Sequence, residues 1–102
     1  MINVVASIRV KEGRKAEFLE IFRANVANVL QEKGCLEYVP TVDVPTGLSL
    51  QELNEHRVTI IEKWQSLEAL RVHLAAPHML AYRMAVKDIV ENVSLKVLAA
   101  AE

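Results

Sequence analysis

Three histidines, His56, His73 and His78, are the only side chains of a type that titrates near neutral pH. They are therefore the first candidates for a catalytic base. His73 follows Leu70 by one helical step, so it lies at the edge of an apolar stripe, where a pocket can reach it. His78 follows Pro77 at a helix start, where a histidine can equally make only terminal hydrogen bonds. We favour His73 over His78 as the base, although a surface or capping role suits either residue taken alone.

A carboxylate and an indole share one face of the strand that precedes these last two histidines. Glu62 lies on a row of core-facing positions, where a carboxylate must be paired, hydrogen-bonded or in contact with a polar cavity. Trp64 lies on the same row, and a tryptophan at a strand end is more often part of the core than a platform for a ligand. Tyr82 and Arg83 project in neighbouring directions from the last helix, which by itself indicates only an amphipathic helix.

Several classes of site have no counterpart in the sequence. It contains no metal-ligand spacing, no glycine motif that would hold a phosphate and no nucleophile elbow. Cys35 is the only cysteine, so it cannot form an intramolecular disulfide or a cysteine-rich metal site, and we expect a reducing compartment. We therefore predict a cytoplasmic protein that uses no metal and no bound cofactor.

The length of the chain indicates how many domains it forms, and its charge limits the kinds of partner that it can bind. The 102 residues suffice for a single domain, residues 1–102, with one modest core. Twelve Lys and Arg residues nearly balance thirteen Asp and Glu residues, so no basic stripe is available for nucleic acid or acidic lipid. The N-terminal stretch MINVVASIRV lacks a charged leader and is too short to cross a membrane, which favours its interpretation as a strand.

The spacing of apolar residues predicts four strands and two helices, the second helix being broken at Pro77. Alternating apolar residues mark the strands, whereas apolar residues three or four apart mark the helices. The predicted strands are residues 2–10, 35–43, 56–65 and 92–98, and the predicted helical segments are 14–33, 67–74 and 77–90. This β-α-β-β-α-β order is the ferredoxin-like arrangement of the α+β class.

Particular residues mark the helix ends and the buried helix faces. Gly34 is expected to end the first helix in a left-handed conformation, and Ser66 is expected to cap the short helix. The predicted apolar stripes are Leu19, Phe22, Val26, Val29 and Leu30 in the first helix and Leu67, Leu70 and Leu74 in the second. Pro40 cannot donate to a ladder, so its strand should lie at an edge of the sheet or contain a bulge.

Helices on one side of a four-stranded sheet leave its other face uncovered. In a monomer that face would be polar, but here apolar and charged residues are mixed on it. Its predicted members are Val5, Val39, Thr59, Ile61 and Leu98 together with Arg57, Lys63, Lys96 and Glu37. A second copy of the same sheet, related by two-fold symmetry, is the simplest cover, and we expect a homodimer.

The connection from Val44 to Glu55, VPTGLSLQELNE, is much longer than a hairpin needs. A proline and a glycine start a turn near its beginning, but its three leucines are too apolar for a purely solvated loop. Two interpretations remain open, an arm that packs on the partner subunit and a lid over a pocket.

The candidate residues also stand in an order that resembles a known family. The segment IIEKWQSLEALRVHLAAPHMLAY carries Glu62, Trp64, His73, Pro77 and His78. An acidic residue and a tryptophan at the end of the third strand, a helix with a histidine and then a Pro-His pair are similar to the antibiotic biosynthesis monooxygenase superfamily. The stretches KEG, EKGCLEYVPTVD and TGLSLQ resemble its bacterial quinol monooxygenase branch, so the resemblance extends over nearly the whole chain.

This resemblance implies a dimeric α+β barrel with one pocket per subunit, in which a quinol or related hydroxylated aromatic reacts with molecular oxygen. No bound cofactor would be needed, because a hydroquinone anion is reducing enough to pass single electrons to dioxygen. The protein would supply an apolar slot, a base and a group that holds the anion. We expect His73 or His78 to be the base and Arg83 to hold the anion. The residues expected to bind the substrate are Leu36, Tyr38, Glu62, Trp64, Met79 and Tyr82.

Departures from the family pattern bear on the function. Some members carry an Asn where this chain has Ile60, so that hydrogen bond is lost. The haem-degrading branch needs a histidine on the last helix, where this chain reads Ala81, Tyr82 and Arg83, which disfavours haem degradation. Two alternatives remain open. One is an isomerase or degradation enzyme for a phosphorylated signalling sugar, with Arg71 and Arg83 as the only local cations. The other is non-enzymatic binding of small aromatics.

Overall fold

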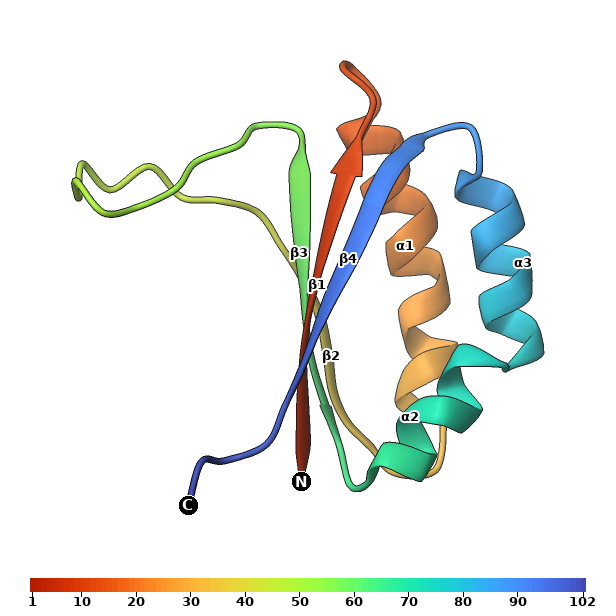
Figure 1. Cartoon of the computed structure of the whole chain (residues 1–102). Coiled ribbons are helices and arrows are strands. Elements are labelled where there is room, and N and C mark those ends of the chain that lie inside the picture. Colours follow the sequence, from red (N-terminus) through yellow and green to blue (C-terminus); the bar gives the residue numbers. More distant parts are fainter.

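A computed structural model describes the whole chain, residues 1–102, as a four-stranded antiparallel sheet with three helices on one of its faces (Figure 1). The strands lie in the order β2-β3-β1-β4. The strands are β1 Ile2–Val10, β2 Cys35–Thr41, β3 Arg57–Trp64 and β4 Val90–Leu98, and the helices are α1 Lys15–Leu30, α2 Leu67–Leu74 and α3 Pro77–Val86. The predicted ferredoxin-like α+β order is therefore confirmed, with its second helix divided into α2 and α3.

The alternation in β1 sets the two faces of the sheet. β1 lies between β3 and β4 and pairs with both in antiparallel register, so that Ala6 stands opposite Ile60 on one side and Leu95 on the other. Because successive side chains point to opposite faces, every second residue of β1 faces the helices. The buried members of β1 are Val4, Ala6, Ile8 and Val10.

Helix α1 packs on the core face through Phe18, Phe22 and Val29, which are buried. Two details of the predicted stripe are wrong. Leu30 is 50% exposed, and Phe18, which was not assigned to the stripe, is fully buried. The helix also ends at Leu30 and not near Lys33, because the chain there turns toward the next strand.

Gly34 adopts the predicted left-handed conformation, with φ of 87°, in the turn between α1 and β2. A Cβ atom at this position would lie 2.7 Å from Cβ of Ala69 in α2, which is too close for any side chain. Glycine therefore serves both the turn and the close approach of α2. The consequence for the site is that the α1–β2 turn lies directly against α2.

Helix α2 confirms its predicted cap and corrects its predicted stripe. Ser66 accepts a hydrogen bond from the backbone of the first turn, as expected of an N-cap. Only Leu70 of the three stripe leucines is buried, whereas Leu67 and Leu74 are 42% and 38% exposed. His73 is buried in their place at 1% exposure. The helix has only eight residues, so its inward side consists of little more than Leu70 and His73, one helical step apart.

The remaining corrections concern the ends of elements. β2 is an edge strand that pairs only with β3, and it ends at Thr41 and not near Asp43, because its ladder with β3 stops at the pair Thr41–Thr59. Pro40 lies on this edge strand, as predicted, and the register of β2 shifts between Cys35 and Glu37. Helix α3 is shorter than expected, since β4 begins earlier than predicted. None of the helices is long and apolar enough to cross a membrane.

The face of the sheet that points away from the helices has no cover in the single chain, and the long 44–55 connection extends on that side (Figure 1). Ile61, near the middle of this face, is 36% exposed, and Leu50 in the connection is 95% exposed. A hydrogen bond of 2.8 Å from the backbone of Asn54 to Asp43 closes the base of the connection. Because the connection lies on the side of the sheet opposite the helices, it does not fit the interpretation as a lid over a pocket of its own chain.

Candidate active site

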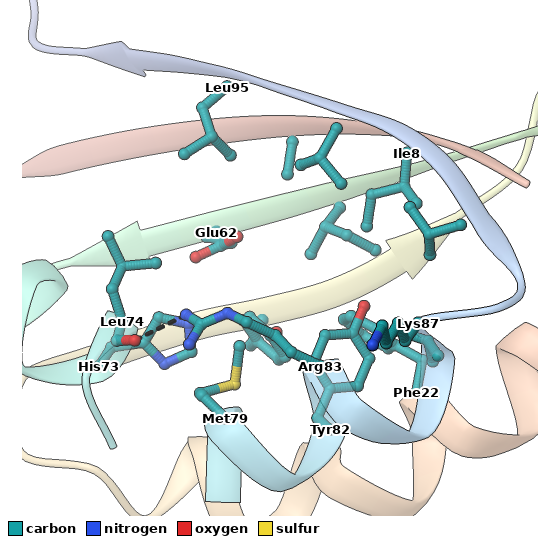
Figure 2. A pocket seen from close by; sticks show the side chains of 16 residues that line it. Ile8, Phe22, Glu62, His73, Leu74, Met79, Tyr82, Arg83, Lys87 and Leu95 are labelled. Carbon is teal, nitrogen blue, oxygen red and sulfur yellow. Dashed lines mark hydrogen bonds between the residues drawn. The ribbon is translucent and has the colours of Figure 1, made fainter. Parts of the chain in front are cut away.

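A cavity of about 430 Å³ lies between the core face of the sheet and the helices (Figure 2). Sixteen residues line it, and twelve of them are hydrophobic. Ile8 and Leu95 form part of its sheet wall, and Phe22 and Tyr82 form part of its helix wall. The polar lining residues are Glu62, His73, Arg83 and Lys87. An apolar cavity with a few convergent polar groups is typical of a small-molecule site.

Glu62 is the only acidic side chain of the lining, and it projects from β3 toward the helices (Figure 2). It is 6% exposed, and its Oε1 accepts a hydrogen bond of 2.9 Å from Nε1 of Trp64. Burial raises the pKa of Glu62, and the hydrogen bond from Trp64 partly opposes that effect. The carboxyl group is thus hydrogen-bonded on one side and borders the cavity, as its core-facing position requires.

His73 forms one end of the cavity from α2. Its ring lies 4.5 Å from the ring of Trp64 and 5.4 Å from that of Tyr38, measured between centroids. Its Nδ1 is 2.8 Å from Oε2 of Glu32. Burial lowers the pKa of His73, and the hydrogen bond with Glu32 partly opposes that effect. The imidazole is therefore neutral at neutral pH, and Nε2 is the ring nitrogen left for a molecule in the cavity.

Glu32, in the turn after α1, joins the two candidate histidines. The same Oε2 atom is 2.8 Å from Nδ1 of His73 and 2.7 Å from Nε2 of His78. The side chain of Glu32 is only 11% exposed, against 27% for that of His78. The carboxylate is thus a mostly buried partner shared by one residue at the cavity and one nearer to solvent.

Three aromatic rings form the wall beside Met79. Phe22 stacks on Tyr38 with 5.2 Å between ring centroids, and it meets Tyr82 edge to face at 5.7 Å. Burial raises the pKa of both tyrosines, so their hydroxyl groups stay protonated at physiological pH. The wall therefore offers flat apolar surface together with neutral hydroxyl groups.

Arg83 lies on α3 at the open rim of the cavity. Its Nη2 donates a hydrogen bond of 2.6 Å to the backbone oxygen of Leu74, which draws the side chain along the cavity wall (Figure 2). Lys87 lines the same rim one helical turn later. Both cations belong to exposed residues, so their charges are solvated and lie beside the entrance.

Six of the nine residues expected at the site line this cavity, and the other three lie elsewhere. The six are Tyr38, Glu62, His73, Met79, Tyr82 and Arg83. Trp64 is fully buried behind Glu62 and His73. His78 contacts Glu32 and is not part of the lining. Leu36 stands at the irregularity of β2, 42% exposed and outside the cavity.

Sequence reasoning missed Glu32 and Lys87. Glu32 lies 41 residues before His73 and outside the helical periodicity, so no spacing rule connects the two. The only local signal is its place in the short turn between α1 and Gly34. Lys87 follows Arg83 by four residues, a spacing that places both on one helix face once the helix is recognised.

The side chains of this chain are not arranged for metal binding or for catalysis by a cysteine thiolate. No group of three or more His, Cys, Asp or Glu side chains is disposed to hold a metal ion. Cys35 is a free, partly buried thiol, and burial raises its pKa, which keeps it protonated and a poor nucleophile. The candidates for acid–base chemistry are therefore the titratable side chains that line the cavity.

Comparison with known proteins gives matches over most or all of the chain. The model of a family described as antibiotic biosynthesis monooxygenase matches residues 1–85. The probable quinol monooxygenase YgiN of Escherichia coli is 38% identical over 100 residues, which cover 96% of each chain. A solved structure from Pseudomonas aeruginosa has a TM-score of 0.81 and 25% identity, covering 99% of this chain and 94% of its own. One from Mycobacterium tuberculosis has a TM-score of 0.81 and 22% identity, covering 99% and 95%.

Proposed function

Because this chain belongs to the antibiotic biosynthesis monooxygenase family, we propose that its cavity binds a quinol or related hydroxylated aromatic and oxidises it with molecular oxygen, without a bound cofactor. The observation that carries this proposal is the cavity itself. It is a mostly apolar slot that has a neutral imidazole and a buried carboxyl group among its few polar groups. A flat aromatic ring with hydroxyl groups matches that combination of surfaces.

The substrate itself supplies the electrons in this reaction. Dioxygen is a triplet in its ground state, so its direct reaction with a neutral singlet molecule is slow, whereas a quinol anion can transfer single electrons to it. One quinol and one dioxygen give one hydroxylated quinone and one water. One oxygen atom replaces a ring hydrogen as a hydroxyl group, and the other leaves as water with the two protons of the quinol hydroxyls. Atoms and electrons balance without a further reductant.

The protein's task is then to form and hold the quinol anion. We assign the base to His73, because its lowered pKa leaves it neutral at physiological pH with Nε2 available to accept the hydroxyl proton. Arg83 would stabilise the anion from the rim by its positive charge. Glu62, whose pKa is raised, would hydrogen-bond the second hydroxyl group. Tyr38, Met79 and Tyr82 would hold the ring.

We also propose a homodimer in which the uncovered faces of two sheets pack on each other. Ile61, Val39 and Leu98 on that face are 36%, 42% and 45% exposed in the single chain, although each is apolar. The 44–55 connection lies on the same side and has three exposed leucines, which suits an arm that packs on the partner. Apolar groups of this extent are usually covered in a soluble protein.

The two alternatives are distinguished by the lining and by the assay. A phosphorylated sugar needs converging cations and many polar partners. Arg83 and Lys87 supply two cations at the rim, but twelve of the sixteen lining residues are hydrophobic, and Arg71 is not part of the lining. This disfavours the sugar isomerase. Storage of an aromatic ligand would use the same apolar walls and would differ only in the absence of oxygen consumption.

The direct test is oxygen uptake with a series of benzo- and naphthohydroquinones, using protein shown to be free of metal and flavin. We expect uptake above the rate of autoxidation, saturation with substrate, and incorporation of one labelled oxygen atom when the reaction is run under ¹⁸O₂. Chelators should leave the rate unchanged. Binding of the quinone without oxygen uptake would support the storage role, and activity that requires added flavin or iron would refute the proposal.

A further inference from the structure

We propose that Glu32 is the positioning residue of this site: it holds His73 in the one tautomer that can act as a base in the cavity, while His78 competes for the same carboxylate oxygen and so tunes that base. This inference rests on the proposed function, since it concerns the residue assigned there as the base. It adds an acidic residue from the α1–β2 turn and gives His78 a role that does not require contact with the substrate.

The hydrogen bonds of Glu32 are concentrated on a single atom. Oε2 lies 2.8 Å from Nδ1 of His73 and 2.7 Å from Nε2 of His78. Oε1 is enclosed by the protein and has no hydrogen-bond partner in the chain. A mostly buried carboxylate with one oxygen unpaired is costly for the fold. The hydrogen bonds with His73 and His78 are therefore the only ones within the chain that offset the cost of burying this carboxylate.

The shared oxygen determines which ring nitrogen of His73 carries the proton. An ionised carboxylate can only accept hydrogen bonds, so Nδ1 of His73 donates to Glu32. A neutral imidazole has one N–H, so Nε2 then carries the lone pair. His73 lines the cavity, and Nε2 makes no hydrogen bond within the chain. When Nε2 takes the hydroxyl proton of a quinol, the O–H bond breaks and the positive charge formed on the ring lies beside the Glu32 carboxylate.

Several charged and titratable groups face His73 from the elements packed around it. They are Glu32 from the α1–β2 turn, Tyr38 from β2, Glu62 from β3, and His78 and Arg83 from α3. The negative charge of Glu32 raises the pKa of His73, whereas positive charge on His78 or Arg83 lowers it. Glu32 and His78 therefore shift the pKa of His73 in opposite directions. His78 does so although it contacts the Glu32 carboxylate and not His73 itself.

The test measures the ring nitrogens of His73 by ¹⁵N NMR in the free, full-length protein, across a pH titration. In the wild type we expect the Nδ1–H tautomer and a pKa below that of an ordinary histidine. Glu32→Gln removes the charge and should lower the pKa of His73 by about one unit or more. Glu32→Asp keeps the charge and should restore part of that change. His78→Ala removes the competing donor and should shift the pKa of His73 upward.

Two control variants make the same changes outside the cavity, one at an exposed residue and one at a half-buried residue. Glu20→Gln removes one negative charge from the surface of α1, and His56→Ala removes a histidine that pairs with Glu55 outside the cavity. Neither should move the pKa of His73. Circular dichroism identifies any variant that does not fold, and the upward shift in His78→Ala tests the inference even if Glu32→Gln is unstable.

The same variants, assayed for oxygen uptake, separate the two proposals. If both hold, the acidic limb of the pH–rate profile moves with the NMR pKa, downward in Glu32→Gln and upward in His78→Ala. An Nε2–H tautomer, or a pKa of His73 that does not respond to Glu32→Gln and His78→Ala, would refute the role of Glu32. A stoichiometric metal ion bound to the two histidines would refute it as well. The expected NMR shifts without any oxygen uptake would instead refute the proposed function and leave the positioning role intact.

Discussion

Polar side chains are buried on one face of the sheet and exposed to solvent on the other, and strand β3 contributes residues to both faces. Its residues alternate between a helix-covered face, with Val58, Ile60, Glu62 and Trp64, and an uncovered face, with Arg57, Thr59, Ile61 and Lys63. On the covered face the only carboxyl group is buried and hydrogen-bonded, and its pKa is raised. On the uncovered face Lys63 lies 3.9 Å from Glu37 with both side chains more than 40% exposed.

This difference separates the proposed site of chemistry from the proposed site of association. A buried polar group feels few competing interactions, so a single neighbour such as Trp64 or Glu32 changes its properties. An exposed ion pair such as Lys63–Glu37 contributes little to stability, because solvent screens it. Charges on the uncovered face therefore do not compensate for the exposure of Ile61 and its apolar neighbours. The comparison predicts that substitutions on the two faces will damage different properties.

The largest effect is expected from Trp64→Ala on the covered face. The indole is fully buried and packs against His73, so its removal should leave a cavity and lower the free energy of unfolding by about 3–5 kcal/mol. Loss of its hydrogen bond to Glu62 adds to the cost. Urea denaturation measures the change, with Val72→Ala, at a 63% exposed position on α2, as the control at less than about 1 kcal/mol. Equal losses in the two variants would contradict the burial of Trp64 as the source of the cost.

On the uncovered face, Ile61→Asp should weaken association and leave the fold of each chain intact. An unpaired carboxylate in a buried interface costs about 3 kcal/mol or more, which corresponds to a hundredfold or greater rise in the dissociation constant of the dimer. Sedimentation velocity at micromolar concentration should show the wild type at twice the chain mass and the variant shifted toward the monomer. Val72→Asp adds the same charge on the exposed side of α2 and serves as the control. A wild-type chain that sediments as a monomer would refute the dimer.

Within the cavity, His73→Ala should reduce oxygen uptake by about two orders of magnitude, because it removes the base and leaves the apolar walls from Tyr38 and Tyr82 in place. The base acts in its deprotonated form, so the wild-type rate should rise with pH through the pKa of His73. Burial lowers that pKa, which places the limb below about pH 6.5. His56→Ala, outside the cavity, should keep both the rate and the profile. An unchanged profile in His73→Ala would assign the limb to another group.

The order of elements and the faces of the strands could be predicted from the sequence because both depend on local periodicity. The alternation in β1 and β3 correctly separated Ile61 from Glu62, since neighbouring residues of a strand always point to opposite faces. Ser66 and Pro77 marked the starts of α2 and α3, because capping and the missing N–H of proline act within one turn.

The candidate site could be predicted only where it lies on those elements. Glu62 was predicted because it interrupts a row of apolar residues, and His73 because it is a titratable residue at the edge of an apolar stripe. Glu32 was missed, because its contact with His73 joins segments that are 41 residues apart and depends on the turn at Gly34. Leu36 was misplaced with respect to the cavity for a related reason, since the register of β2 shifts beside it and no local pattern indicates a shift.

The smallest effect concerns the pH dependence of stability at Glu62, the one carboxyl group on the covered face of β3. Burial raises the pKa of Glu62 in the folded protein above the value of about 4.5 in the unfolded chain. The folded state thus favours the protonated carboxyl, whose contribution to stability is complete below about pH 4.5 and is lost as the pH rises through the raised pKa.

Glu62→Gln keeps an acceptor for Trp64 but does not titrate, so the variant should gain stability relative to the wild type as the pH rises. The gain is about 1.4 kcal/mol for each unit by which the pKa is raised. His73 also titrates in this range, but it is present in both proteins and cancels in the difference. Urea denaturation between about pH 4 and 8 measures that difference. Glu20→Gln, at the exposed surface of α1, should show none, and a pH-independent difference for Glu62→Gln would mean that burial does not govern this carboxyl group.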